Sequence, residues 1–143
     1  MSSRKKDGNQ TEAQTTARLR AAGLRPTSQR KALAGLLYKA GNRHVSAETL
    51  HAEALRAGVK VSLATVYNTL HQFTGAGLLQ QVVVDASRSY FDTNLGPHQH
   101  FYCPDEETLI DIPSGSIAVS GLPAAPAGTS VERVDVIVRL KRE

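Results

Sequence analysis

The run from Ser62 to Leu78 constrains the fold most, because it predicts a long helix with an apolar face and an uncharged polar face. Ser62 is a favoured N-cap residue, and Gly75 and Gly77 mark the end of the helix. At about 100° per residue, one apolar stripe is formed by Leu63, Val66, Leu70 and Phe73. The other face carries Ala64, Tyr67, Asn68 and His71 and has no carboxylate. Such a face suits hydrogen bonding to base edges in a DNA groove, and an ordinary surface helix is the alternative.

The charge of the chain is divided unevenly along its length. Residues 1–60 carry 12 Lys and Arg against 4 Asp and Glu, whereas residues 61–143 carry 5 against 9, which makes the halves +8 and −4. A basic half followed by an acidic half favours a nucleic-acid partner for the first half. A solvated basic surface without a partner is the alternative.

The composition indicates a soluble cytoplasmic protein with no membrane partner. No apolar run approaches the roughly 20 residues of a membrane span. The first residues are polar and basic and do not resemble a secretory signal. A single cysteine excludes an internal disulfide and a four-cysteine zinc site.

The first part of the chain alternates helical patterns with capping residues. We expect a polar, basic, disordered tail at residues 1–13 and helices at 14–22, after Thr27 or Ser28, after Ser46, and after Ser62. Inward positions are predicted for Leu33, Leu36, Leu37, Ala40, Ala47, Leu50, Ala54 and Leu55. Strands are expected at residues 78–84 and 89–92, joined by a turn. Helices followed by a hairpin predict a winged helix-turn-helix domain over residues 14–92, with its last helix in the major groove.

The second part of the chain is shorter and β-rich. Residues 93–97 look like a hinge, and strands are expected at 99–103, 109–112 and 131–140, with at most one short helix near 117–120. A unit of about 45 residues has little core of its own, so self-association would bury its faces. We therefore predict an α+β protein in which a small, self-associating, β-rich unit, residues 98–143, follows the winged helix.

Several possible metal ligands cluster around the predicted hinge. His98 and His100 are two residues apart on a strand and point to the same side. Asp92 ends the preceding strand, Asp111 lies on the next one, and His44 precedes the third helix. Such nitrogen and oxygen donors suit Fe²⁺ or Mn²⁺, with Zn²⁺ as a substitute in vitro. The alternatives are solvated histidines, a surface Asp111 and a helix-capping His44, and spacing alone does not bring the five together.

Four motifs occur in an order and spacing that resemble the ferric uptake regulator (Fur) superfamily over roughly residues 15–140: 22–30, 44–48, 61–68 and 98–100. Residues 90–94, the cysteine-poor second domain and the ending 136–142 most resemble its iron response regulator (Irr) branch. The resemblance implies a homodimeric, cytoplasmic transcription regulator of iron or haem metabolism, in which a small α/β dimerisation and ligand-sensing domain, residues 98–143, follows the winged helix. It would act as a repressor or as an activator on double-stranded DNA with an inverted-repeat operator.

The resemblance also implies roles for particular residues. By position, His44, Asp92, His98, His100 and Asp111 match a regulatory metal site that bridges the two domains. Tyr67 matches a base-contacting residue, and Arg25 matches a basic residue that reaches toward the minor groove. We expect the DNA contacts to comprise Arg25, Arg30, Ser62, Ala64, Thr65, Tyr67 and Asn68.

The departures from the family pattern bear on its cofactors. Cys103 stands where a CxxC pair begins and Glu106 where it ends, so no structural CxxC zinc is expected. Pro97 and Gln99 replace further family ligands, and Asn68 replaces an Arg found in many iron sensors. The Irr branch implies haem as effector, bound through His98 and His100, with the Cys103-Pro104 dipeptide as a further candidate. A peroxide-sensing repressor of the same superfamily is the alternative. A small non-haem metal enzyme is a remote one, since it would not need a basic helical half.

Overall fold

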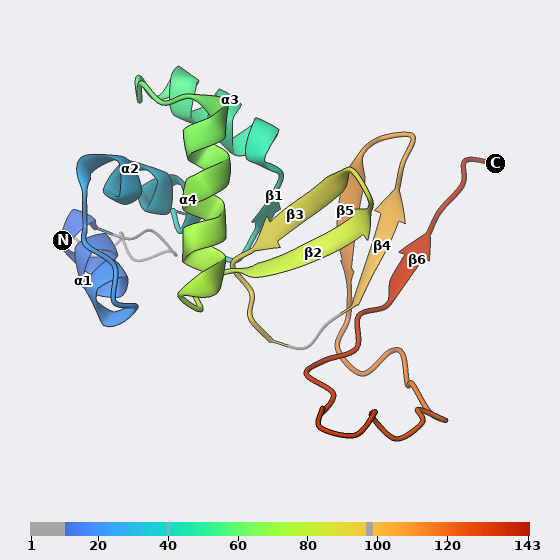
Figure 1. The fold of residues 1–143 in the computed structure, drawn as a ribbon. Coiled ribbons are helices and arrows are strands. Elements are labelled where there is room, and N and C mark those ends of the chain that lie inside the picture. Colours follow the sequence, from blue (N-terminus) through green and yellow to red (C-terminus); the bar gives the residue numbers. More distant parts are fainter. Residues whose placement is uncertain (1–10, 40, 97–98) are drawn as a thin grey trace, which may run out of the picture. The chain divides into compact units, whose positions relative to one another are not determined.

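The computed structural model describes residues 11–39, 41–96 and 99–143, which divide into two compact units, Met1–Leu95 and Gly96–Glu143 (Figure 1). The first unit contains α1, α2, β1, α3, α4, β2 and β3 in chain order, and the second contains β4, β5 and β6. A helical part followed by small sheets agrees with the predicted α+β class. Residues 1–10 of the predicted tail, Ala40, Pro97 and His98 lie outside the described residues.

The helices of the first unit begin where Ser or Thr hydroxyls can cap them. They are α1 (Glu12–Ala21), α2 (Ser28–Leu37), α3 (Ala47–Arg56) and α4 (Leu63–Gly75). In each, the cap hydroxyl accepts a hydrogen bond from the backbone N–H of the third helical residue; the caps are Thr11, Thr27, Ser46 and Ser62. The predicted start of α1 at Gln14 is wrong, because Thr11 and Gln14 form a reciprocal capping box and the helix begins at Glu12. Glu12 and Ala13 therefore belong to α1, and Thr11 is its N-cap.

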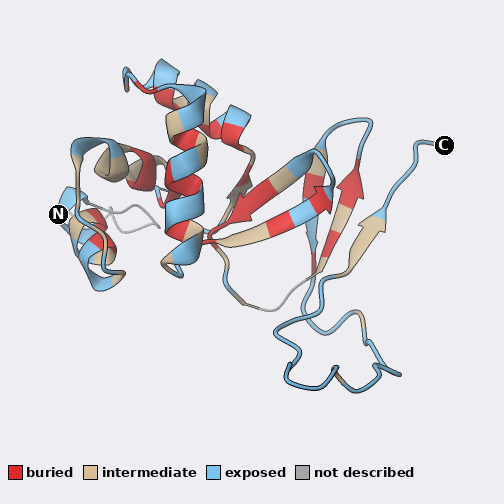
Figure 2. Ribbon diagram, in the orientation of Figure 1, coloured by how far each residue is buried: buried red, intermediate tan, exposed pale blue. Residues whose placement is uncertain are grey.

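The core of the first unit lies where the helices face one another, and Figure 2 shows their buried sides. Its main residues match the predicted stripes and include Leu33, Leu37, Leu50, Val66, Leu70 and Phe73. Two predicted core residues are instead exposed. Leu63 is 37% exposed because it is the first residue of α4, and Leu55 is 54% exposed because it lies one residue beyond the inward-facing Ala54.

A three-stranded antiparallel sheet of order β1-β3-β2 completes the first unit. The predicted hairpin is formed by β2 (Gln80–Asp85) and β3 (Arg88–Asp92), and the Asp85 carboxylate in its turn accepts hydrogen bonds from the N–H and the hydroxyl of Ser87. These bonds lower the pKa of Asp85, the backbone one most. The sequence did not predict β1 (His44–Val45), since two residues are too few to show a period.

The second unit is a sheet of order β5-β4-β6, in which β5 is antiparallel and β6 parallel to β4. The strands β4 (Gln99–Cys103) and β5 (Thr108–Ile112) lie where they were predicted. The predicted strand 131–140 is too long, because only β6 (Ile137–Arg139) pairs with β4. No helix occurs between residues 99 and 143, including the one considered at 117–120, since 113–130 is an exposed segment interrupted by Pro113, Pro123 and Pro126 (Figure 2).

Among the described helices, the longest has 13 residues, and none combines the length and apolar character needed to cross a bilayer.

Candidate functional site

The outer face of α4 presents the polar side chains that the sequence predicted. Ser62, Ala64, Asn68 and His71 are exposed, whereas Thr65 and Tyr67 are half-buried. The Tyr67 ring packs against the core and stacks on the His71 imidazole. This face therefore combines exposed hydrogen-bonding groups with one aromatic ring that its neighbours hold in place.

A polar hollow of about 310 Å³ lies between the start of α2 and the outer face of α4. Of the predicted DNA contacts, Arg25, Arg30, Thr65 and Asn68 line it. The Arg30 guanidinium donates to the Arg25 carbonyl at 3.0 Å and to the Gln72 side-chain oxygen at 3.1 Å. Arg30 thus ties α2, the preceding loop and α4 together, and Gln72 is a participant that the sequence did not single out.

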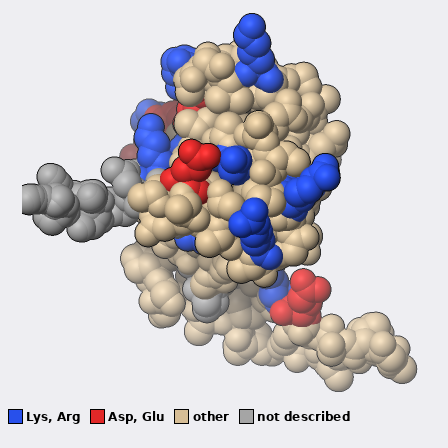
Figure 3. All heavy atoms as spheres, turned by 90° about the vertical axis from the view of Figure 1, so that its left-hand side faces the viewer, with Lys and Arg blue, Asp and Glu red and all other residues tan. Residues whose placement is uncertain are grey.

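Lys and Arg side chains are spread over the face of the helical unit shown in Figure 3, with few Asp and Glu among them. Some cations of this unit form ion pairs, since Lys31 Nζ lies 3.3 Å from a carboxylate oxygen of Glu12 and an Arg43 guanidinium nitrogen lies 2.7 Å from one of Glu53. The excess of Lys and Arg over Asp and Glu gives this face the character of a phosphate-binding surface.

The first unit also places a histidine and an aspartate directly opposite each other on neighbouring strands. His44 on β1 pairs in register with Asp92 on β3. Side chains at such cross-strand positions have Cβ atoms about 4.5–5.5 Å apart, close enough for both to reach one ion. Asp92 is 1% exposed, and one of its carboxylate oxygens accepts a hydrogen bond of 2.8 Å from the Asn94 N–H.

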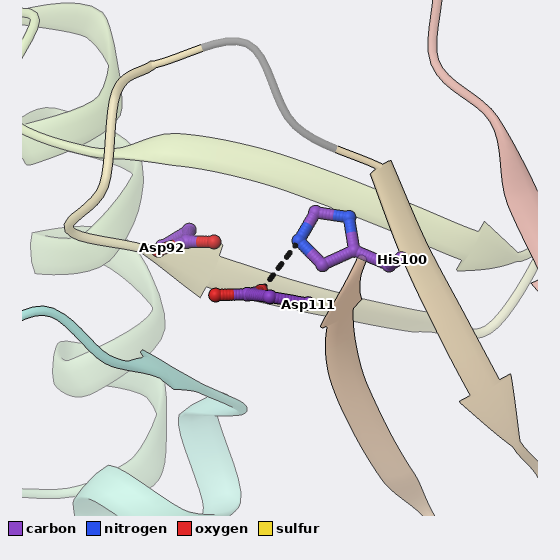
Figure 4. A group of neighbouring side chains, drawn as sticks. All are labelled: Asp92, His100 and Asp111. Atoms are coloured by element: carbon purple, nitrogen blue, oxygen red, sulfur yellow. Dashed lines mark ion pairs between the residues drawn. The ribbon is translucent and has the colours of Figure 1, made fainter. Parts of the chain in front are cut away.

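The second unit repeats this arrangement with another histidine and another aspartate. His100 on β4 pairs in register with Asp111 on β5, and His100 Nε2 lies 3.3 Å from Asp111 Oδ1. Figure 4 shows this contact as a dashed line, and it also labels Asp92 at the end of β3. Each unit therefore places one imidazole opposite one carboxylate on adjacent strands. Such nitrogen and oxygen donors suit a divalent first-row metal ion.

Cys103 lies on β4 as well, but on the other face of the strand. Cys103 is the third residue after His100, and side chains alternate along a strand, so the thiol and the imidazole point to opposite sides. The thiol is buried at 7% exposure and forms no disulfide. Glu106, in the turn after β4, forms an ion pair with Arg142. His98 lies outside the described residues, so its position relative to this face stays a prediction.

Comparison with known proteins decides which family these features belong to. A model of the ferric uptake regulator family matches residues 21–137. The chain belongs to the ferric uptake regulator family. It is 37% identical over 100 residues to the ferric uptake regulation protein of Pseudomonas aeruginosa, a match that spans 69% of this chain and 75% of that protein.

Two solved Fur structures share the fold. The ferric uptake regulator of Vibrio cholerae superposes with a TM-score of 0.69 at 22% identity, over 89% of this chain and 98% of that one. The ferric uptake regulator of Pseudomonas aeruginosa with manganese gives 0.66 at 26% identity, over 90% and 98%. These matches confirm the predicted α+β arrangement of a DNA-binding domain followed by a dimerisation domain, and they identify a transcription regulator of the Fur family.

Proposed function

We propose that this Fur-family chain is a dimeric transcription regulator of iron metabolism whose DNA binding is controlled by a divalent metal ion. The observation that carries the proposal is the His–Asp pair in each unit, one beside the helices and one in the small sheet. The basic surface, the hollow lined by Arg25 and Arg30, and the polar face of α4 support a DNA-binding role for the first unit.

The proposed DNA contacts fall into two groups. Ser62, Ala64, Thr65, Tyr67 and Asn68, all at or near the start of α4, would read base edges in the major groove. Arg25 and Arg30 would bind the sugar-phosphate backbone, Arg25 toward the minor groove. A dimer would apply these groups to two half-sites related by symmetry, which makes an inverted-repeat operator the expected target.

The proposed metal ligands are His44, Asp92, His98, His100 and Asp111. The donor set contains no thiolate and fits Fe²⁺ or Mn²⁺, with Zn²⁺ as a substitute in vitro. The relative from Pseudomonas aeruginosa was solved with manganese, which supports this choice. When bound, the ion would link the first domain, residues 14–92, to the sensing domain, residues 98–143, across a hinge at 93–97. The spacing of the two recognition helices in the dimer would then depend on the metal.

The test is a DNA-binding titration followed by fluorescence anisotropy, with an operator obtained by binding-site selection and metal-free protein. We expect Mn²⁺ to tighten specific binding by about 5- to 150-fold, the range of a coupling free energy of about 1–3 kcal/mol. Asp111→Asn should lose this tightening, whereas the matched control Asp105→Asn, in the exposed turn after β4, should keep it. The proposal fails if Asp111→Asn responds to Mn²⁺ as the wild type does.

We propose haem as a second effector, on the strength of the Irr-like segment 90–94 and the lone cysteine. The proposed haem ligands are the imidazoles of His98 and His100 and the thiol of Cys103. His100 and Cys103 lie on opposite faces of β4, so one haem would use either the imidazole or the thiol from this strand. A spectroscopic titration of haem distinguishes them. We expect His100→Ala to abolish the shift of the main haem absorption band and Cys103→Ser to keep it. The opposite result would assign haem to Cys103.

A peroxide-sensing repressor is the alternative within the family, and the two Asp ligands favour it. Treatment of the Fe²⁺-loaded protein with peroxide would then oxidise a ligating histidine and release the operator irreversibly. Mass spectrometry of His44, His98 and His100 after this treatment separates the alternative from reversible control by metal or haem.

A further inference from the structure

β1 carries one of the proposed metal ligands but has little support of its own. It consists of His44 and Val45 alone, whereas strands in globular proteins usually have five or six residues. Two ladder pairs, His44 with Asp92 and Val45 with Phe91, hold it against β3. The position of His44 relative to Asp92 therefore depends on what fixes the residue just before the strand, which is Arg43.

The backbone of Arg43 is bonded on both sides to Thr93, the residue that follows Asp92. The Arg43 N–H donates to the Thr93 hydroxyl oxygen at 2.9 Å, and the Thr93 N–H donates to the Arg43 carbonyl at 2.9 Å. The Thr93 hydroxyl also lies 3.2 Å from the same carbonyl. These bonds continue the His44–Asp92 register by one residue, with a hydroxyl in place of one backbone group. Thr93 is 8% exposed, so water does not easily replace them.

The side chain of Arg43 is anchored to two helices. Its guanidinium donates to both carboxylate oxygens of Glu53 on α3, at 3.0 and 2.7 Å. The nitrogen that makes the longer of these bonds also lies 3.3 Å from the Leu36 carbonyl on α2. A bidentate Arg–carboxylate pair fixes the orientation of the guanidinium as well as its distance. Arg43 is thus bound to α2, α3 and the end of β3 at once.

We propose that Arg43 is a positioning residue for the metal site, held by Glu53 and Thr93, and that this arrangement sets the affinity of His44 and Asp92 for a divalent cation. The inference rests on the proposed function, because it needs His44 and Asp92 to be ligands. Groups that orient metal ligands without touching the metal typically change metal affinity by about 10- to 100-fold when they are removed. Thr93 and Glu53 would orient the ligands in this way, without touching the metal, because both hold Arg43 in place.

The experiment measures the Mn²⁺ dissociation constant of the full chain by electron paramagnetic resonance of free Mn²⁺, at a temperature where circular dichroism shows each variant folded. We expect Thr93→Val to bind Mn²⁺ about 10- to 100-fold more weakly, because the hydroxyl is lost while the shape is nearly kept. Thr93→Ser, which keeps the hydroxyl, should bind within about threefold of the wild type. Glu53→Gln should weaken binding as well, and it replaces Thr93→Val if that variant does not fold.

His44→Ala, titrated in parallel, distinguishes a failure of the positioning role from a failure of the proposed metal site. If His44→Ala loses affinity while Thr93→Val and Glu53→Gln keep it, the positioning role is wrong and the proposed metal site stands. If His44→Ala binds Mn²⁺ as the wild type does, His44 is not a ligand, and the proposed site and the positioning role both fail. Equal melting temperatures with unequal Mn²⁺ affinities for Thr93→Val and Thr93→Ser would show that Thr93 acts on the site and not only on stability.

Discussion

The imidazole of His71 stacks on the ring of Tyr67, with the ring centroids 5.6 Å apart and an interplanar angle of 20°. Phe91 on β3 presents its ring nearly perpendicular to both, with centroids 6.4 Å from Tyr67 and 5.4 Å from His71. The proposed base-contacting ring is therefore held from two directions before any DNA arrives. It is also in contact with the residue that precedes Asp92.

His71→Ala should weaken specific DNA binding by about 0.5–1.5 kcal/mol, the usual contribution of one aromatic contact, because Tyr67 loses its stacking partner. His71→Phe should restore most of the affinity. Anisotropy titrations against the selected operator and against unrelated DNA measure the effect, and only the operator titration should change. Wild-type affinity for His71→Ala would mean that Tyr67 needs no such support.

Arg25→Ala and Tyr67→Ala should weaken DNA binding in different ways. Loss of a phosphate contact should reduce the slope of log affinity against log salt concentration by about 0.9, whereas loss of a base contact should cost about 1–3 kcal/mol on the operator alone. Titrations at several salt concentrations separate the two. Lys141→Ala, in the second unit, is the control and should leave both quantities unchanged. If both variants bind as the wild type does, the assignment of α4 to the groove is wrong.

The Arg43–Glu53 ion pair should make stability depend on pH in the acidic range. The hydrogen bonds from Arg43, more than the Coulombic attraction, lower the pKa of Glu53 below its ordinary value of 4.5. The stabilisation is therefore complete above that value and is lost as the pH falls through the lowered pKa. The melting temperature of Glu53→Gln should lie below that of the wild type at about pH 6, and the gap should narrow as the pH falls below 4.5. Glu48→Gln on the same helix should show no such convergence, and a constant gap for Glu53→Gln would contradict the prediction.

One face of the second unit carries a row of apolar side chains that self-association would cover. Ile110 on β5, 46% exposed, and the half-buried Val138 on β6 flank Phe101 on β4 in register. Ile110→Asp should shift the chain from dimer to monomer in sedimentation velocity at micromolar concentration, because a carboxylate would be desolvated in the interface. A charge at Val119, exposed in the segment 113–130, is the control. A stable dimer of Ile110→Asp would place the interface elsewhere.

The absence of a CxxC pair predicts that no sulfur-bound zinc supports this fold. Protein purified without added metal and treated with EDTA should keep its melting temperature, and Cys103→Ser should bind Mn²⁺ as the wild type does. X-ray absorption at the zinc edge tests the same point, since a zinc–sulfur shell near 2.3 Å would refute it.

Local sequence patterns predict most of the helical part of the fold. Ser62 and Ser46 were identified as caps because a hydroxyl before an apolar period has a direct local meaning. The strand 131–140 was overestimated because alternation alone does not say how many residues find a partner, and β6 pairs over three residues. Leu63 shows what helical periodicity does not predict. It lies on the apolar stripe, but as the first residue of α4 it extends beyond the core and is exposed.

The sequence predicts which residues form the candidate site, but it does not predict which of them face each other on neighbouring strands. His44 and Asp92 lie far apart in the sequence, and no periodicity states that they face each other in register. The sequence does not predict the role of Arg43 for the same reason, because its partners Glu53 and Thr93 belong to a helix and to the end of a strand. Tyr67 and His71 are four residues apart on one helix, so their stacking could have been anticipated from helical geometry.

The parallel pairing of β6 with β4 has a consequence during translation. β4 can pair with β5 once Ile112 has left the ribosome, but its other edge, including the His100 N–H that donates to the Val136 carbonyl, waits for residues 136–139. Every strand and helix of the first unit is complete by Asp92. Because domains fold in order as they leave the ribosome, a nascent chain acquires its basic helical unit well before the sheet that carries His100 and Asp111 can close. For that interval the growing polypeptide would carry the proposed DNA-binding surface without the unit proposed to sense the metal.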